Sequence, residues 1–138
     1  MKILYINTAE DKAKIGLVGD DKVKFLEFGP KQKFSEKLLT KIDQLLKEQK
    51  TKPEDLDAVA VFRGPGSFTG LRIGIAAANA FGFTLNIPII EISENDAKNL
   101  EQSIIKKFQN LPRDKFEGKI VVPFYGKKPN ITKSKKIQ

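Results

Sequence analysis

A glycine-rich turn between a strand-like run and a helix-like run constrains the fold of this chain more than any other feature. Residues 57–63 are mostly apolar and include two valines, which is typical of a short strand buried on both faces. Residues 68–86 favour a helix, which must end before Pro88 because proline cannot continue it. The turn consists of Gly64, Pro65, Gly66, Ser67, Phe68 and Thr69. Glycine supplies unusual backbone angles there, and Ser67 or Thr69 can cap the first N–H groups of the helix.

This turn has two interpretations. Backbone N–H groups and the helix dipole at such a position can bind a phosphate. However, no lysine directly follows these glycines as a P-loop requires, and a dinucleotide-binding fingerprint would need glycine where Thr69 stands. In the second interpretation, the glycines serve only the turn and close packing. The sequence alone allows both.

Small residues recur at every fourth position of the predicted helix, at Gly70, Gly74, Ala78 and Gly82. Each glycine costs about 1 kcal/mol of helix stability relative to alanine, so this stripe predicts that a neighbour approaches closely. That neighbour is either part of this chain or a partner. If Gly74 faces a partner, Gly74→Leu is expected to block binding without harming the fold. Arg72 and two asparagines interrupt the apolar run, so a membrane span is not expected.

The remaining chain predicts an α/β fold with a mixed sheet of five to six strands flanked by helices. Strands are predicted at residues 2–7, 13–19, 22–28, 57–63, 89–92 and 120–124, and helices at 35–49, 68–86 and 96–109. Asp20 and Asp21 mark a tight hairpin between the second and third strands. Three antiparallel strands are therefore expected to join parallel strands connected by helices.

Several segments resemble one protein family. The run Gly64–Gly74 (GPGSFTGLRIG) is similar to the signature of the bacterial TsaB, or YeaZ-like, proteins, the accessory subunits of the machinery that makes threonylcarbamoyladenosine in tRNA. The opening MKILYINTA at residues 1–9, FSEKLL at 34–39 and LDAVAV at 56–61 resemble further parts of that family. PFYGKKP at residues 123–129 resembles its closing segment more loosely. The resemblance implies a single actin-like, ribonuclease H-like domain.

The spacing of these segments predicts a reduced form of the family. Members typically have two domains, yet only residues 94–118 separate the first domain from the closing segment here. We therefore expect a ribonuclease H-like domain at 1–93, a short helix and strand at 94–124 in place of most of the second domain, and a basic tail at 125–138.

Composition argues against chemistry by this chain. The sequence contains neither Cys nor His, which excludes thiolate catalysis, a Ser-His-Asp arrangement and the commonest transition-metal ligand. Asn7 stands where actin-like ATPases, and many TsaB-like chains, place the aspartate that holds a nucleotide-bound cation, so we expect it to be a turn residue that bonds its own backbone. No catalytic residue, metal or cofactor is expected. The absence of an apolar leader favours the cytoplasm.

The resemblance implies a non-catalytic subunit that binds and activates a TsaD-type protein, the enzyme that modifies the adenosine next to the anticodon. A TsaE-type ATPase would join this complex, and a homodimer is an additional expectation. Two stripes on the first two predicted helices form the expected partner interface, although core packing would also explain them. The predicted interface residues are Phe34, Leu38, Leu39, Ile42, Leu46, Gly70, Ile73, Gly74, Ala77, Ala78 and Phe81.

Positive charge is concentrated at the C-terminal end. The chain carries a net charge of +8, and residues 113–138 hold 8 Lys or Arg against 2 acidic residues. Such a run suits the phosphate backbone of tRNA, and it is also typical of a solvated tail. The candidate RNA-contacting residues are Lys127, Lys128, Lys133, Lys135 and Lys136. The alternative function is therefore a stand-alone nucleotide- or RNA-binding domain that uses the glycine turn and this tail.

Overall fold

The computed structural model describes residues 1–111 and 121–122. The strands are β1 (Lys2–Asn7), β2 (Ala13–Gly19), β3 (Val23–Phe28), β4 (Ala58–Phe62) and β5 (Ile89–Ile92). The helices are α1 (Phe34–Glu48), α2 (Phe68–Leu85), α3 (Glu94–Ala97) and α4 (Leu100–Gln109). Short 3₁₀ turns at Lys31–Lys33 and Pro53–Asp55 precede α1 and β4.

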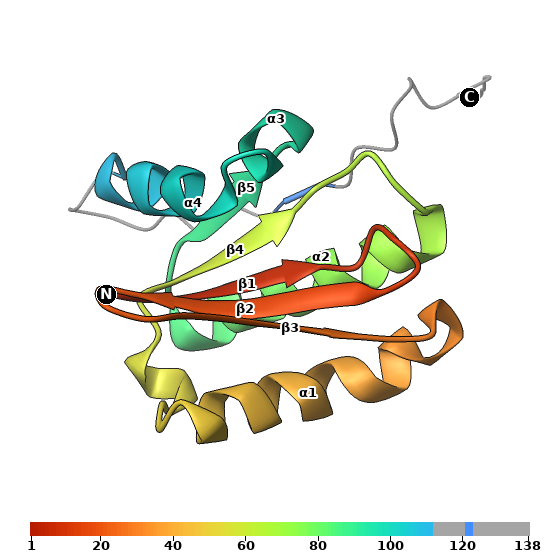
Figure 1. Cartoon of the computed structure of the whole chain (residues 1–138), viewed down its shortest axis with the longest axis horizontal. Coiled ribbons are helices and arrows are strands. Elements are labelled where there is room, and N and C mark those ends of the chain that lie inside the picture. Colours follow the sequence, from red (N-terminus) through yellow and green to blue (C-terminus); the bar gives the residue numbers. More distant parts are fainter. Residues whose placement is uncertain (112–120, 123–138) are drawn as a thin grey trace.

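The five strands form one mixed sheet in the order β3-β2-β1-β4-β5. β1, β2 and β3 are antiparallel neighbours, whereas β4 pairs in parallel with β1 and with β5. The predicted hairpin at Asp20–Asp21 is confirmed, because the Gly19 N–H donates to the Lys22 carbonyl at 2.8 Å. α1 and α2 cover one face of this sheet, and α4 lies on the other beside β5 (Figure 1). All five residues of β4 are buried, as expected of a strand covered on both sides.

The close neighbour of the small-residue stripe is this chain's own sheet. At Gly70 an added Cβ would overlap the Thr8 carbonyl oxygen, and at Gly74 it would overlap the Thr8 hydroxyl. The Thr8 hydroxyl accepts a hydrogen bond from the Gly74 N–H at 3.0 Å and donates one to the Gly70 carbonyl. α2 therefore lies against the end of β1, where two glycines allow backbone to approach backbone.

The apolar character of α2 matches this internal role. The helix is long and apolar enough to cross a membrane, with 18 residues and a mean hydropathy of 1.2. Its buried residues are Gly70, Leu71, Gly74, Ile75, Ala78 and Gly82. They form a continuous face that packs on β1, β4 and β5, as in the core helix of an α/β domain.

The single helix predicted at residues 96–109 is wrong, because the chain forms two helices here. Ser93 starts α3 with a reciprocal cap: its hydroxyl accepts from the Asp96 N–H at 3.1 Å, and the Asp96 carboxylate accepts from the Ser93 N–H at 2.9 Å. Asn99, with φ −134° and ψ 64°, then leaves the helical region before α4 begins. The cap at Ser93 therefore starts α3, and this short helix ends before Asn99.

α4 contributes to the same hydrophobic core as residues 1–93. Ile104 is fully buried in that core, and the Lys107 ammonium donates to the Glu91 carbonyl of β5 at 2.9 Å. Val121 also belongs to the core, and its backbone N–H and carbonyl both bond the Asn79 side chain, at 2.9 and 3.1 Å. Residues 121 and 122 are not in a strand, and the other residues of the predicted sixth strand lie outside the described part of the chain.

We expect Asp96→Asn to reduce the free energy of unfolding by about 1 kcal/mol at pH 7, as the loss of a good helix cap does. Burial raises the pKa of Asp96, but hydrogen bonds from Lys107 and Ser93 and the Lys107 charge outweigh it and lower the pKa overall. Because the pKa of Asp96 is lower in the folded than in the unfolded state, its ionised carboxylate stabilises the protein fully at pH values above the unfolded-state pKa. This contribution disappears as the pH falls through the folded-state pKa.

Urea unfolding at pH 7 and at about pH 3, below the ordinary aspartate pKa of about 3.9, measures this effect. The difference between Asp96→Asn and the unmodified chain should be smaller at the lower pH. Glu94→Gln in the same helical turn is the matched control, with an expected change below about 0.5 kcal/mol. An equal difference at both pH values would contradict the electrostatic explanation.

Candidate functional site

Most of the predicted interface on α1 lies in the core of this chain. Phe34, Leu38, Ile42 and Leu46 are at most 3% exposed and pack beneath the sheet. The expectation that they face a partner is therefore corrected. α1 has one apolar stripe, and the helix uses that stripe to cover the sheet. Leu39 points the other way and is 63% exposed.

The predicted interface on α2 divides in the same manner. Gly70, Gly74 and Ala78 are buried against the sheet, which corrects their assignment to a partner surface. Small residues at every fourth position permit close packing on any neighbour, and in this chain the neighbour is the end of β1. Ile73, Ala77 and Phe81 are only partly buried and remain accessible.

Accessible residues from both helices, together with the buried Leu38, line one apolar groove, which we call the α1–α2 groove. Its volume is about 560 Å³. The lining residues are Ser35, Leu38, Leu39, Pro53, Ile73, Ala76, Ala77, Ala80, Phe81, Thr84 and Leu85. None of them is charged, and several are alanines on one side of α2. An exposed apolar groove of this kind is typical of an interaction site.

The glycine turn packs against the loop that follows β1. Ser67 caps α2 by accepting from the Gly70 N–H at 3.2 Å, and the Ser67 N–H donates to the Ala9 carbonyl at 3.1 Å. A Cβ at Gly66 would overlap Ala9, and Gly64 has a positive φ of 118°. These contacts support the packing interpretation, since two N–H groups that a phosphate cradle would need are already bonded.

Of the remaining predicted site residues, those at the start of α2 are described by the structure and those of the basic tail are not. Phe68 and Thr69, at the start of α2, are exposed, and the Arg72 guanidinium lies 5.1 Å from the centre of the Phe68 ring. The candidate RNA-contacting lysines, Lys127, Lys128, Lys133, Lys135 and Lys136, lie outside the described residues.

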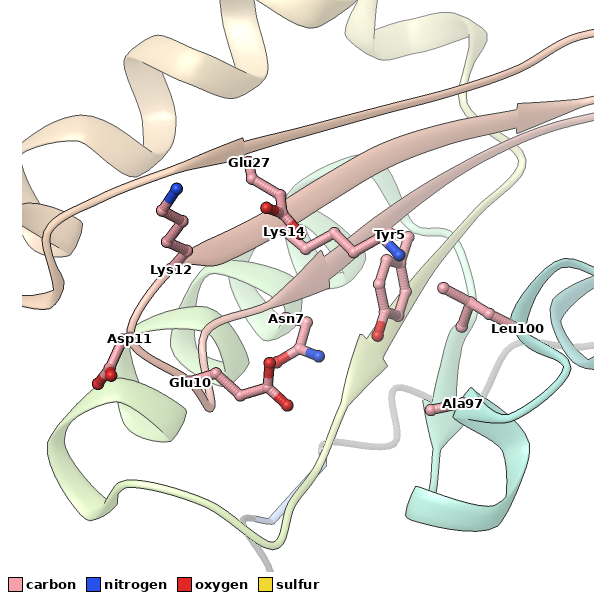
Figure 2. Close-up of a pocket in the computed structure, with 9 residues that line it drawn as sticks. All are labelled: Tyr5, Asn7, Glu10, Asp11, Lys12, Lys14, Glu27, Ala97 and Leu100. Carbon is pink, nitrogen blue, oxygen red and sulfur yellow. The ribbon is translucent and has the colours of Figure 1, made fainter.

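A second concave site, which we call the polar cleft, lies on the opposite face of the sheet (Figure 2). Its floor is built by the strand register. Asn7 pairs with Lys14 and Lys14 with Glu27, so these three side chains form one row across β1, β2 and β3. The loop after β1 adds Glu10, Asp11 and Lys12, and Ala97 and Leu100 line the side nearest α3 and α4. The volume is about 590 Å³.

The next row of the sheet positions a buried tyrosine beneath this cleft. Tyr5 pairs with Gly16, and Gly16 pairs with Phe25. Because Gly16 has no Cβ, the Phe25 ring lies across it and meets the Tyr5 ring edge-on, with the ring centres 6.3 Å apart. The Lys14 ammonium lies 4.6 Å from the centre of the Phe25 ring.

The electrostatics of the cleft keep Tyr5 protonated. Burial raises its pKa far above the usual value, a hydrogen bond with Asn7 lowers it, and the Glu10 charge raises it. Asn7 is confirmed as a turn residue that bonds its own backbone, because its side-chain oxygen accepts from the Ala9 N–H at 2.9 Å. It therefore does two things, closing the turn after β1 and contacting the tyrosine.

Sequence reasoning missed this cleft. The alternation of Tyr5 and Asn7 along β1 places both on one face, and that much could have been found from the period of two. The row from Asn7 to Glu27 depends on the pairing register of three strands, and Leu100 reaches the cleft only because α4 packs beside β5. Those contacts join residues that are far apart in the sequence.

The fold defines the class of protein to which this chain belongs. A mixed five-stranded sheet in this order, with helices on both faces, is a ribonuclease H-like domain of the actin-like superfamily. The solved structure of YeaZ from Pseudomonas aeruginosa matches with a TM-score of 0.64 and 27% sequence identity, over 67% of this chain and 45% of that chain.

Relatives identify the family. The tRNA threonylcarbamoyladenosine biosynthesis protein TsaB of Escherichia coli (strain K12) is 35% identical over 94 residues, which cover 67% of this chain and 40% of that protein. TsaB of Bacillus subtilis (strain 168) is 34% identical over 95 residues, covering 67% and 41%. The family described as "TsaD: tRNA N6-adenosine threonylcarbamoyltransferase" matches residues 30–112. This chain belongs to that family, in its TsaB (YeaZ) branch. It spans about 40% of the length of these curated relatives.

Proposed function

We propose that this chain is a non-catalytic subunit that binds and activates a TsaD-type catalytic protein. The complex would form threonylcarbamoyladenosine at the anticodon-adjacent adenosine of tRNA. Membership of the TsaB branch supports the pathway, and the α1–α2 groove is the observation that carries the proposed mode of binding. With no His or Cys, this chain would supply a surface that holds the catalytic protein in its active form.

The groove suits a helix of another protein. Leu39 and Phe81 offer apolar area, and Ala76, Ala77 and Ala80 allow a partner helix to approach closely. Burying Leu39 alone would contribute about 1.5 kcal/mol or more, because most of its side chain faces water in the isolated chain.

A TsaD-type protein is the occupant that the comparisons favour. The family described as TsaD matches the region of this chain that contains α1 and α2, residues 30–112. A related threonylcarbamoyltransferase of Pediococcus pentosaceus is 46% identical over 52 residues, covering 38% of this chain and 15% of that protein. Related domains can pair through equivalent helices about an approximate two-fold axis, as copies in a symmetric dimer do. A homodimer through the same groove would then compete with the mixed complex.

The other partners follow from this assignment. A TsaE-type ATPase would join the mixed complex, and tRNA would reach this chain indirectly or through the basic residues beyond position 122. The cytoplasm is the compartment that this function requires.

Size-exclusion chromatography with light scattering tests the proposal. The full chain and the TsaD-type protein of the same organism are run separately and mixed, at about 50 μM each, well above a Kd of about 1 μM. We expect a mixed complex whose mass is the sum of the masses of its subunits. A reconstituted modification assay, with and without this chain, then measures activation.

Two separate peaks at that concentration would reject the proposal. Binding of tRNA or a nucleotide by the isolated chain, together with two separate peaks, would favour the stand-alone alternative. A mixed complex without any gain in tRNA modification would leave binding intact and overturn activation.

A further inference from the structure

The polar cleft contains a buried hydrogen-bond donor whose direction is fixed by its neighbours. The Asn7 side-chain oxygen accepts from the Ala9 N–H at 2.9 Å, so the amide nitrogen of Asn7 is the end that faces Tyr5. Figure 2 shows the Tyr5 hydroxyl pointing toward Asn7, at the inner end of the cleft. Because an amide nitrogen can only donate, Asn7 can bond the Tyr5 hydroxyl oxygen but cannot accept the hydroxyl proton.

That proton needs an acceptor. Tyr5 is 1% exposed, and no protein acceptor for its hydroxyl is present among the hydrogen bonds of residues 1–111 and 121–122. An unsatisfied buried donor destabilises the protein, and a bound acceptor oxygen would remove that cost. The inner end of the cleft therefore favours a ligand that carries a carboxylate or carbonyl oxygen.

The rim of the cleft carries both signs of charge. Asp11 is paired with Lys31 at 3.5 Å. In the described part of the chain no ion pair involves Glu10, Glu27 or Lys14, although all three line the cleft. Lys14 can bind an anionic group, and Glu10 beside Asn7 can bind a cationic one (Figure 2).

This combination favours one class of ligand over the others. A nucleotide phosphate would meet the carboxylates of Glu10 and Glu27, which have no ion-pair partner among the described residues, and those residues hold no cluster of acids suited to a metal ion that would offset the repulsion. A simple carboxylate would leave Glu10 without a partner, and a simple amine would leave the Tyr5 proton and Lys14 without one.

We infer that the polar cleft binds a free α-amino acid. Its carboxylate would accept from the Tyr5 hydroxyl and the Lys14 ammonium, and its ammonium group would face Glu10. Its side chain would contact Ala97 and Leu100, the apolar wall of the cleft. The site lies on the sheet face opposite the α1–α2 groove, so it does not depend on the proposed binding of a TsaD-type protein.

Nuclear magnetic resonance titration of the full ¹⁵N-labelled chain with each of the common L-amino acids tests this site. At least one should shift the backbone amides of Asn7, Lys14 and Leu100 with a Kd of about 1 mM. Acetate and methylamine, which each carry half of the recognised group, should bind about tenfold more weakly or worse. Acetate or methylamine binding as tightly as the best amino acid would overturn the assignment of the ligand class.

Two variants locate the contacts. Tyr5→Phe retains the ring and removes the donor, and Glu10→Gln removes the carboxylate charge, so each should weaken amino-acid binding about tenfold. Glu36→Gln, an exposed acid on α1, is the matched control and should bind as the unmodified chain does. No shift near the cleft with any amino acid, or unchanged binding by Tyr5→Phe, would overturn the inference.

Discussion

Replacing Leu39 and Ala80 together with aspartate should weaken binding to the TsaD-type protein by about 100-fold or more, as loss of a central interface contact does. Both residues line the α1–α2 groove, and both are exposed in the isolated chain, so the change should leave the fold intact. Two carboxylates buried against an apolar partner would lose their hydration without gaining a counter-charge. Isothermal titration calorimetry measures the affinity.

Phe83→Asp is the matched control for this experiment. Phe83 is 85% exposed on the same helix, but it does not line the groove. The Phe83→Asp variant should therefore bind the TsaD-type protein with an affinity within about threefold of that of the unmodified chain, as peripheral substitutions do. The opposite result, in which Phe83→Asp disrupts the complex and the groove variant does not, would place the interface on another side of α2.

Gly70→Ala should lower the free energy of unfolding by about 2–3 kcal/mol, which is the cost of overpacking a tight contact. Alanine would favour the helix by about 1 kcal/mol, but its Cβ would overlap the Thr8 carbonyl oxygen, which cannot move away by changing a side-chain rotamer. Gly74→Leu should be more damaging still, because it meets the Thr8 hydroxyl and Ile6. That variant would therefore lose the fold as well as the partner, because Gly74 faces the sheet and the intact fold was expected only for a glycine that faces a partner. Urea denaturation measures these changes.

Gly82→Ala separates this explanation from a general effect of glycine replacement. A Cβ at Gly82 would overlap Cγ1 and Cδ1 of Ile89, which can move away by a change of rotamer, and it would lie 3.3 Å from the Ile87 carbonyl oxygen, a much looser contact than the one at Gly70. The free energy of unfolding should then change by less than about 1 kcal/mol in either direction. If Gly70→Ala proved as harmless as Gly82→Ala, the close approach of α2 to Thr8 would not be a determinant of stability.

The division of α2 into an inner and an outer side explains how one helix can serve both stability and binding. Its glycine stripe lies against the end of β1, whereas Ala76, Ala77 and Ala80 line the groove beside α1. The groove is therefore held in place by the same helix that anchors the sheet. Such a rigid surface loses little conformational entropy when a partner binds.

Local sequence determined the elements of this fold. All five strands within the described residues, and helices α1 and α2, lie within two residues of their predicted bounds. The signals that set these bounds are local: the apolar periods, the Ser67 cap, the Asp20–Asp21 turn and Pro88 each affect only residues close to them in the chain. The glycine signature also pointed to the TsaB branch. It can be found in the sequence because the tight turn that it forms depends on residues that are adjacent in the chain.

Only the tertiary structure decided how those elements use their faces. The stripe from Gly70 to Gly82 permits close packing on any partner, and Thr8, about sixty residues earlier, determines that it lies inside. Asn99 breaks the predicted third helix where Lys107 reaches back to Asp96, at 2.7 Å. The polar cleft exists because strand register sets Asn7 beside Lys14 and because the packing of α4 beside β5 brings Leu100 to its wall. Each outcome rests on contacts between distant residues, whose free energy depends on the three-dimensional packing and leaves no local pattern in the sequence.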